Sequence, residues 1–224
     1  MERMTSPRRL PWDGALTLVR HGETDFNAQD KFLGVLDEPL NDNGLAQARK
    51  AASWLERWAK EHAVSFDVVV SSPLRRCHQT ATIIGATFDL DVQVEPLLVE
   101  RNYGAFEGMR KKDAARRYPE TYAAYKARKA TTRPPGDGAE VVADIEARVD
   151  RFLNETLPRK HHAAREIVVV THLNPIRACY RLLGLADESI YYTPFANTSL
   201  SRILVRRDGD CSFAYCDENP SGGD

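Results

Sequence analysis

Residues 16–24 read LTLVRHGET, and the change of character inside this stretch decides how the rest of the chain is interpreted. Its first four residues are apolar or β-branched, which is typical of a short buried strand. Arg20 and His21 follow without a break, and Gly22 provides a turn. Because ligands of an open α/β sheet bind beyond the carboxyl ends of its strands, we expect Arg20 and His21 to face a crevice.

The composition indicates one globular domain. The chain has 224 residues, of which 42% are hydrophobic and 28% are charged, enough to bury one core. The 31 basic and 32 acidic residues nearly cancel, so no overall field favours nucleic acid or an anionic membrane. No apolar run suits a signal peptide or a membrane span, and the four cysteines lack metal-site spacing. We therefore expect a cytoplasmic protein with free thiols that binds neither nucleic acid nor membrane.

Two further strands end in polar residues that open a helix. Residues 66–72 read FDVVVSS, and a helical pattern begins after Pro73 with Arg75 and Arg76. Residues 166–171 read EIVVVT and end at His172, after which residues 173–177 open another helix. Helix N-termini attract anions, and a second histidine at a strand end favours one shared pocket over coincidence.

An acidic segment separates these two units. Residues 97–108 read LLVERNYGAFEG, so that Glu100 stands beside an arginine and near a tyrosine in a stretch closed by two glycines. This composition is typical of a pocket wall. Residues 112–129 are basic and alanine-rich, with Ala114, Tyr118, Tyr122 and Tyr125 at helical spacing, which predicts a helical cap over the pocket.

The order of these motifs resembles that of the histidine phosphatase superfamily, the phosphoglycerate mutase-like proteins. The resemblance rests on RHGET with Asn27 a few residues on, on SSPLRR at 71–76, and on the second strand-end histidine. It covers residues 16–204 and implies an α/β fold, a three-layer α/β/α sandwich around a mostly parallel sheet. It also implies the catalytic residues: His21 as nucleophile, Glu100 as proton donor, and Arg20, Arg76 and His172 around the phosphoryl group.

The resemblance also suggests substrate contacts. The family's loop over the phosphate corresponds to residues 28–43 and includes Gly34. Arg101, Tyr103 and Lys111 fall where the mutases contact a phosphoglycerate, while Arg75 is expected to be a solvated charge. The predicted substrate-binding set is therefore Asn27, Gly34, Arg101, Tyr103, Lys111 and Asn174.

Two departures from the family pattern stand out. The family's His-Gly becomes His172 and Leu173, which removes a small residue and is expected to narrow the pocket floor. The family's Gly-Gly-Glu-Ser motif is replaced by DGAEV at 137–141, in which Glu140 alone is a plausible match.

Phosphoryl transfer needs an in-line nucleophile and positive charge around the phosphoryl oxygens. Arginine donates paired hydrogen bonds to phosphate and stays protonated, and a neutral His21 could attack phosphorus if its other nitrogen donates to a backbone carbonyl near Gly22. A protonated His172 would add a third charge, so no metal is expected. Glu100 would protonate the leaving oxygen.

Three functions stay open on the sequence. The first is a phosphatase that hydrolyses a small phosphorylated metabolite, either a sugar phosphate or a phosphoglycerate-like acid. The second is a mutase, which would need a trace of 2,3-bisphosphoglycerate as its only cofactor and a pocket closed to water. The third is a catalytically weak protein that binds a phosphorylated ligand.

The expected domain organisation is simple. Residues 1–13 are predicted to be a flexible leader, residues 14–216 the phosphatase domain with a cap at about 105–135, and residues 217–224 a loose tail. A monomer or a homodimer is expected.

Overall fold

One mixed sheet organises the protein. The computed structural model describes residues 10–127, 129–206 and 208–222. Its six-stranded sheet has the order β3-β2-β4-β1-β5-β6. The first four strands in this order are parallel, and β5 and β6 continue the sheet as antiparallel neighbours. The strands are β1 (Gly14–Arg20), β2 (Val68–Ser71), β3 (Val92–Val94), β4 (Glu166–Thr171), β5 (Leu200–Val205) and β6 (Cys211–Glu218).

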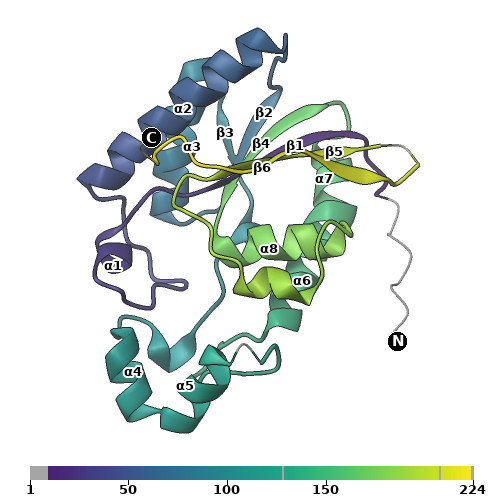
Figure 1. Ribbon diagram of the computed structural model, residues 1–224. Helices are drawn as coiled ribbons and strands as arrows, with labels where there is room; N and C mark the ends of the chain where they lie inside the picture. Colours follow the sequence, from purple (N-terminus) through teal and green to yellow (C-terminus); the bar gives the residue numbers. More distant parts are fainter. Residues whose placement is uncertain (1–9, 128, 207, 223–224) are drawn as a thin grey trace.

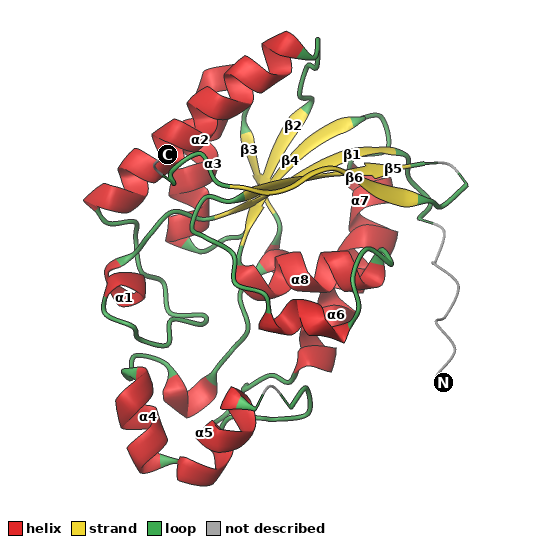
Figure 2. Ribbon diagram, in the orientation of Figure 1, coloured by secondary structure: helices red, strands yellow, loops and turns green. Residues whose placement is uncertain are grey.

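Helices cover both faces of this sheet (Figures 1 and 2). Helices α2 (Asp42–Glu61) and α3 (Arg75–Phe88) lie on one face, and α6 (Val142–Arg151), α7 (Leu157–Lys160) and α8 (Leu173–Leu182) lie on the other. A π-helical turn (Phe152–Thr156) joins α6 to α7. The predicted three-layer sandwich with a mostly parallel sheet is therefore confirmed.

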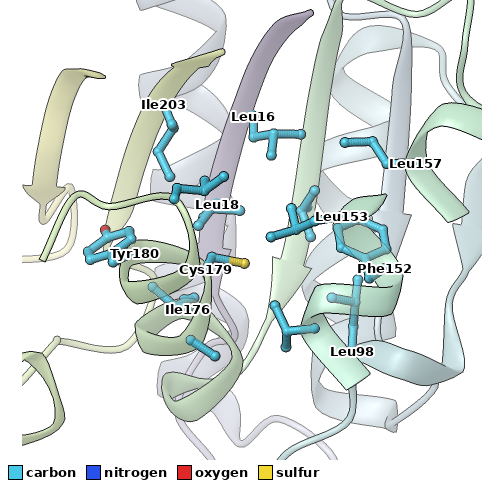
Figure 3. Close-up of a cluster of buried hydrophobic side chains, with 14 of the residues drawn as sticks. Leu16, Leu18, Leu98, Phe152, Leu153, Leu157, Ile176, Cys179, Tyr180 and Ile203 are labelled. Carbon is cyan, nitrogen blue, oxygen red and sulfur yellow. The ribbon is translucent and has the colours of Figure 1, made fainter. Parts of the chain in front are cut away.

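The alternation of side chains along the central strands builds the two cores. In β4, Ile167 and Val169 face α6, α7 and α8, whereas Val168 and Val170 face α2 and α3. Figure 3 shows the first of these cores, in which Leu16 and Leu18 of β1 pack with side chains of the second helical layer. Burial on both faces explains why β4 is a continuous apolar run in the sequence.

Two helices begin where strands end. α3 follows β2 after a short turn, and α8 follows β4 directly, with His172 as its N-cap. The N-cap of α2 is Asn41, whose side chain accepts a hydrogen bond from the Gly44 amide at 2.8 Å. These starts bring helix N-termini to the carboxyl edge of the sheet.

A small helical layer lies beyond that edge. It comprises α1 (Asp25–Ala28), α4 (Lys111–Arg117) and α5 (Pro119–Lys126), with a 3₁₀ turn at Gly104–Phe106 (Figure 1). Two other 3₁₀ turns, Pro96–Leu98 and Glu188–Tyr192, pack with α6 and α8 instead. Helices α4 and α5 fall inside the range predicted for the cap. Phe32, Phe106 and Ala114 are buried in it, and partly buried tyrosines at 103, 118, 122 and 125 pack around them. The predicted shared face of Ala114 and the tyrosines is confirmed.

The two ends of the domain differ from the prediction. Residues 1–9 of the predicted leader lie outside the described residues. Leu10 and Trp12 are buried, and the Trp12 indole donates to the His161 and Ala164 carbonyls at 3.2 and 3.0 Å, so a flexible leader is wrong for residues 10–13. At the other end β6 continues to Glu218, beyond the expected boundary, because its antiparallel pairing with β5 reaches Leu200.

Beyond β6, the Ser221 hydroxyl contacts that of Thr198 at 2.9 Å, so the predicted loose tail is fixed at least here. Within the described parts of the chain, no helix is long and apolar enough to cross a membrane.

Replacing Trp12 tests the role of the N-terminal residues. Trp12→Ala should lower the free energy of unfolding by about 3–5 kcal/mol, because it removes a buried aromatic side chain and a paired indole donor. Urea denaturation measures this change, with Val94→Ala, at a side chain that is 46% exposed, as the control. A loss similar to that of the control would mean that these residues are dispensable.

Candidate active site

Adjacent strand ends bring the two histidines together. In the sheet Arg20 pairs with Thr171, and the His21 amide donates to the Thr171 carbonyl at 3.0 Å. The next residue of each strand is a histidine, and the rings of His21 and His172 meet edge to face with centroids 5.1 Å apart. The structure thus brings both predicted histidines into one site.

His21 is held in one tautomer. Its Nδ1 lies 2.7 Å from the Gly22 carbonyl oxygen, which can only accept, so Nδ1 carries the proton and Nε2 keeps its lone pair. The ring is 3% exposed, and this burial, with the charges of Arg76 and Arg20, lowers the pKa of His21 well below its ordinary value. At neutral pH the imidazole is therefore uncharged, which is the state in which it can act as a nucleophile.

The glycine of the motif is required by packing. A Cβ on Gly22 would lie 2.5 Å from the carbonyl oxygen of Gly44, at the start of α2. Gly34 has a φ of +58°, and a Cβ there would lie 2.0 Å from Oε1 of Glu107. The same oxygen accepts hydrogen bonds from the Val35 and Tyr103 amides, so Glu107 fixes the loop over the pocket.

Two arginine side chains accompany His21 in the site. Arg76 is fully buried and donates to the carbonyls of Leu36 and Gly34 at 2.7 and 2.6 Å. Arg20 donates to the Phe195 carbonyl. The Nε atoms of both arginines are buried and, among the described residues, have no hydrogen-bond partner. Burial lowers the pKa of Arg20 to about 10, so it still carries its charge at neutral pH.

His172 differs from the prediction in its charge. It is completely buried, its Nε2 lies 2.8 Å from the Ser72 hydroxyl, and Cys77 Sγ lies 3.3 Å from the same atom. Burial and the nearby Arg76 lower the pKa of His172 well below its ordinary value. In the substrate-free protein His172 is therefore neutral, and the expected third cation is absent from this position.

Glu100 faces the same site from the segment after β3. Its side chain is 8% exposed, and its Oε1 accepts hydrogen bonds from the Arg101 amide at 2.7 Å and from Asn174 at 3.0 Å. Within the described residues only Oε1 receives such bonds. Oε2 is left as the oxygen that can carry a proton.

These groups line a catalytic pocket of about 150 Å³. Of the predicted residues, the structure places eight on its wall: Arg20, His21, Asn27, Gly34, Arg76, Glu100, Tyr103 and Lys111. His172 and Asn174 stand behind this wall, against Ser72 and Glu100 respectively. Leu173 also lines the pocket, as its replacement of a glycine led us to expect.

Arg101 lies elsewhere. Its guanidinium donates to the carbonyls of Thr132 and Glu140 at 2.6 and 2.9 Å and lies over the Tyr103 ring, outside the catalytic pocket. Glu140, the one plausible match in the altered motif, accepts from the Asn102 amide and pairs with Arg148. Both residues brace the segment that carries Glu100.

Sequence reasoning missed four lining residues, Lys31, Phe32, Leu33 and Tyr125. Tyr125 had a signal, because its helical spacing with Tyr118 and Tyr122 already placed it in the predicted cap over the pocket. The other three lie in the loop over the pocket, and nothing in the local pattern distinguishes them. No cluster of three or more His, Cys, Asp or Glu side chains suited to a metal ion occurs among the described residues.

A neutral histidine beside two charged arginines, at the carboxyl ends of parallel strands, defines an α/β protein with a site for an anionic group. The profile of the histidine phosphatase superfamily (branch 1) matches residues 16–216. The chain belongs to this superfamily.

Several proteins of this superfamily are similar to the chain over most of its length. The chain is 36% identical to phosphoserine phosphatase 1 of Hydrogenobacter thermophilus over 80% of each sequence. It is 39% identical to phosphoglycerate mutase-like protein 4 of Arabidopsis thaliana, over 87% of this chain and 80% of the relative. Among solved structures, the alpha-ribazole phosphatase from Shigella flexneri is similar with a TM-score of 0.78 at 25% identity, covering 94% of this chain and 99% of that one.

The lowered histidine pKa values predict a pH-dependent stability. Below the ordinary value of 6.5 the unfolded chain binds protons that native His21 and His172 do not bind, so stability falls as the pH decreases. Each histidine adds up to about 1.4 kcal/mol per pH unit to this slope. Denaturant titrations from pH 7 to 5 should give a shallower slope for His172→Asn than for wild type. The control Val94→Ala, which removes no titratable group from an exposed position, should keep the wild-type slope, and equal slopes for all three proteins would contradict the assignment.

Proposed function

We propose that this protein is a metal-independent phosphomonoesterase that hydrolyses a small phosphorylated metabolite through a phosphohistidine at His21. The observation that carries the proposal is the hydrogen bond from His21 Nδ1 to the Gly22 carbonyl, which leaves Nε2 unprotonated between Arg20 and Arg76. The fixed tautomer supplies the nucleophile, and the arginines supply the positive charge that phosphoryl transfer requires.

In the first step, the His21 Nε2 lone pair forms a bond to phosphorus while the bond from phosphorus to the ester oxygen breaks. The leaving oxygen takes a proton from Glu100 and departs as an alcohol. Arg20 and Arg76 neutralise charge on the phosphoryl oxygens. Neutral His172, held by Ser72, supports the His21 ring edge to face and becomes a cation only if the bound dianion raises its pKa.

In the second step, Glu100, now ionised, accepts a proton from a water molecule. The oxygen of that water bonds to phosphorus, and the bond to Nε2 breaks, which returns neutral His21 and releases inorganic phosphate. After both steps, Glu100 is protonated and His21 is neutral again, so no other residue has to gain or lose a proton.

The pocket supports a small anionic substrate. Its volume of about 150 Å³ is modest, and Lys31 and Lys111 add positive charge at its mouth. The Lys111 ammonium pairs with Asp30, and this ion pair connects α4 to the loop after α1. A sugar phosphate or a phosphoglycerate-like acid has the matching charge, and the phosphoserine and phosphoglycerate in the names of the two relatives belong to this size class.

A mutase is the second candidate, favoured by the aromatic cap over the pocket and by the name of the Arabidopsis relative. It would return the phosphoryl group to the substrate before water reacts. Supplying 3-phosphoglycerate with a trace of 2,3-bisphosphoglycerate distinguishes the two, because a phosphatase releases phosphate and a mutase produces 2-phosphoglycerate.

The first experiment tests the nucleophile. With EDTA present, the protein should hydrolyse p-nitrophenyl phosphate and members of a panel of sugar and three-carbon phosphates. His21→Ala should reduce phosphate release by about three orders of magnitude or more, since it removes the attacking atom. His62→Ala is the matched control. Retention of activity in His21→Ala, or its loss on adding EDTA, would exclude the proposed mechanism.

A second experiment tests the proton donor. Glu100→Gln should reduce kcat/KM for an alkyl phosphate by about 10²–10⁴-fold, because its leaving oxygen needs a proton. The loss should be much smaller for p-nitrophenyl phosphate, whose leaving group departs without one. Equal losses on both substrates would assign Glu100 a structural role instead.

A further inference from the structure

A smaller cavity adjoins the catalytic pocket on its cap side. Tyr103 and Tyr125 line both hollows, so the two hollows meet at these side chains. Asn174 also lines the smaller cavity, and its amide donates to Tyr103 Oη and to Glu100 Oε1, each at 3.0 Å. A group bound in this cavity would therefore lie one side chain away from the proposed acid.

The lining of this cavity is cationic. Arg101, Arg177 and Lys129 contribute to it, and the two arginines are only 6% and 5% exposed. The other lining residues are Tyr103, Tyr125, Ala130, Val142, Asn174 and Tyr191. None of these nine residues, all of which the structure describes, carries a carboxylate.

Both guanidinium groups are fixed before any ligand binds. Arg101 donates to the Thr132 and Glu140 carbonyls, and Arg177 donates to the Thr193 carbonyl. Arg177 is also close enough to Arg20 for its charge to lower the pKa of Arg20, so the two sites share one positive field. Positive charge gathered in a buried place is stabilised when an anion enters it.

We propose that this cavity is a carboxylate subsite, formed by Arg101, Arg177 and Lys129, for the part of the substrate that is not transferred. The inference rests on the proposed function and narrows its substrate to phosphorylated carboxylic acids. The volume of about 30 Å³ supports a carboxylate, since it offers room for about two water molecules and no room for a sugar ring.

This assignment gives Arg101 a different place from the one expected for it. The sequence predicted that Arg101 contacts the substrate in the same pocket as Tyr103 and Lys111, whereas the structure sets Arg101 behind Tyr103. From there it can reach only a second group of the substrate. Arg177 and Lys129, which the sequence analysis did not select, complete the set.

Matched substrates test the subsite. 3-Phosphoglycerate and glycerol 3-phosphate share a skeleton and differ at the carboxylate. Wild type should favour the acid in kcat/KM by about 10- to 100-fold, the value expected for hydrogen bonds to a charged group. Arg177→Met should reduce this ratio to about threefold or less, and Arg177→Lys should retain part of it. O-phosphoserine and phosphoethanolamine provide a second pair.

Controls separate charge from folding. Lys112→Met removes an exposed lysine of α4 outside the cavity and should keep the wild-type ratio. Lys129→Met, at an exposed lining residue, should lower the ratio even if Arg177→Met proves unstable in thermal unfolding. A wild-type ratio near one, or a ratio that neither Arg177→Met nor Lys129→Met changes, would overturn the subsite.

Binding to His21→Ala keeps this test independent of turnover. Calorimetry should show tighter binding of 3-phosphoglycerate than of glycerol 3-phosphate, and Arg177→Met in the same background should remove the difference. If wild type releases no phosphate but the binding contrast holds, the proposed function fails and the subsite stands. Glycerol 1,3-bisphosphate has a second phosphate in place of the carboxylate. If it binds as tightly as 3-phosphoglycerate, the restriction to carboxylates is wrong.

Discussion

The parallel pairing of β4 with both β1 and β2 is the constraint on which the rest of the structure depends. Register places Arg20 beside Thr171 and Ser71 beside Val170, so the three strands stop at one edge. Each strand then delivers one part of the site: His21 from β1, Arg76 through α3 after β2, and His172 after β4. A shift of one residue in any pairing would turn these side chains away from one another.

The electrostatic character of the site follows from burial at that edge. Arg20 and Arg76 carry positive charge at this edge, while burial and these charges keep both histidines neutral. The site therefore stays positively charged through its arginines while its histidines carry no charge. It can attract a phosphoryl dianion and still offer an unprotonated imidazole nitrogen to attack it.

The sequence predicted the sheet-end residues well because their signal is local. An apolar run that stops at a histidine or an arginine identifies both the strand and the side chain that leaves it, as at residues 16–21 and 166–172. Trp12 gave no such signal, since its burial depends on carbonyls about 150 positions away.

The protonation of His172 and the position of Arg101 were also missed. Each depends on neighbours that come together only in the folded protein: Arg76 for the former, and the Thr132 and Glu140 carbonyls for the latter. Arg177 and Tyr191 were missed for the same reason, because they lie in or after α8 and meet the cap residues of the smaller cavity only in the folded protein.

The cap has a further consequence for how this protein could diversify. Six side chains that line the two hollows belong to one continuous segment, residues 101–130, whereas His21, Arg20 and Arg76 belong to the sheet edge. Insertions or exchanges in that segment leave the paired strands intact. One inherited reaction centre can therefore be adapted to new metabolites by replacing one stretch of some thirty residues.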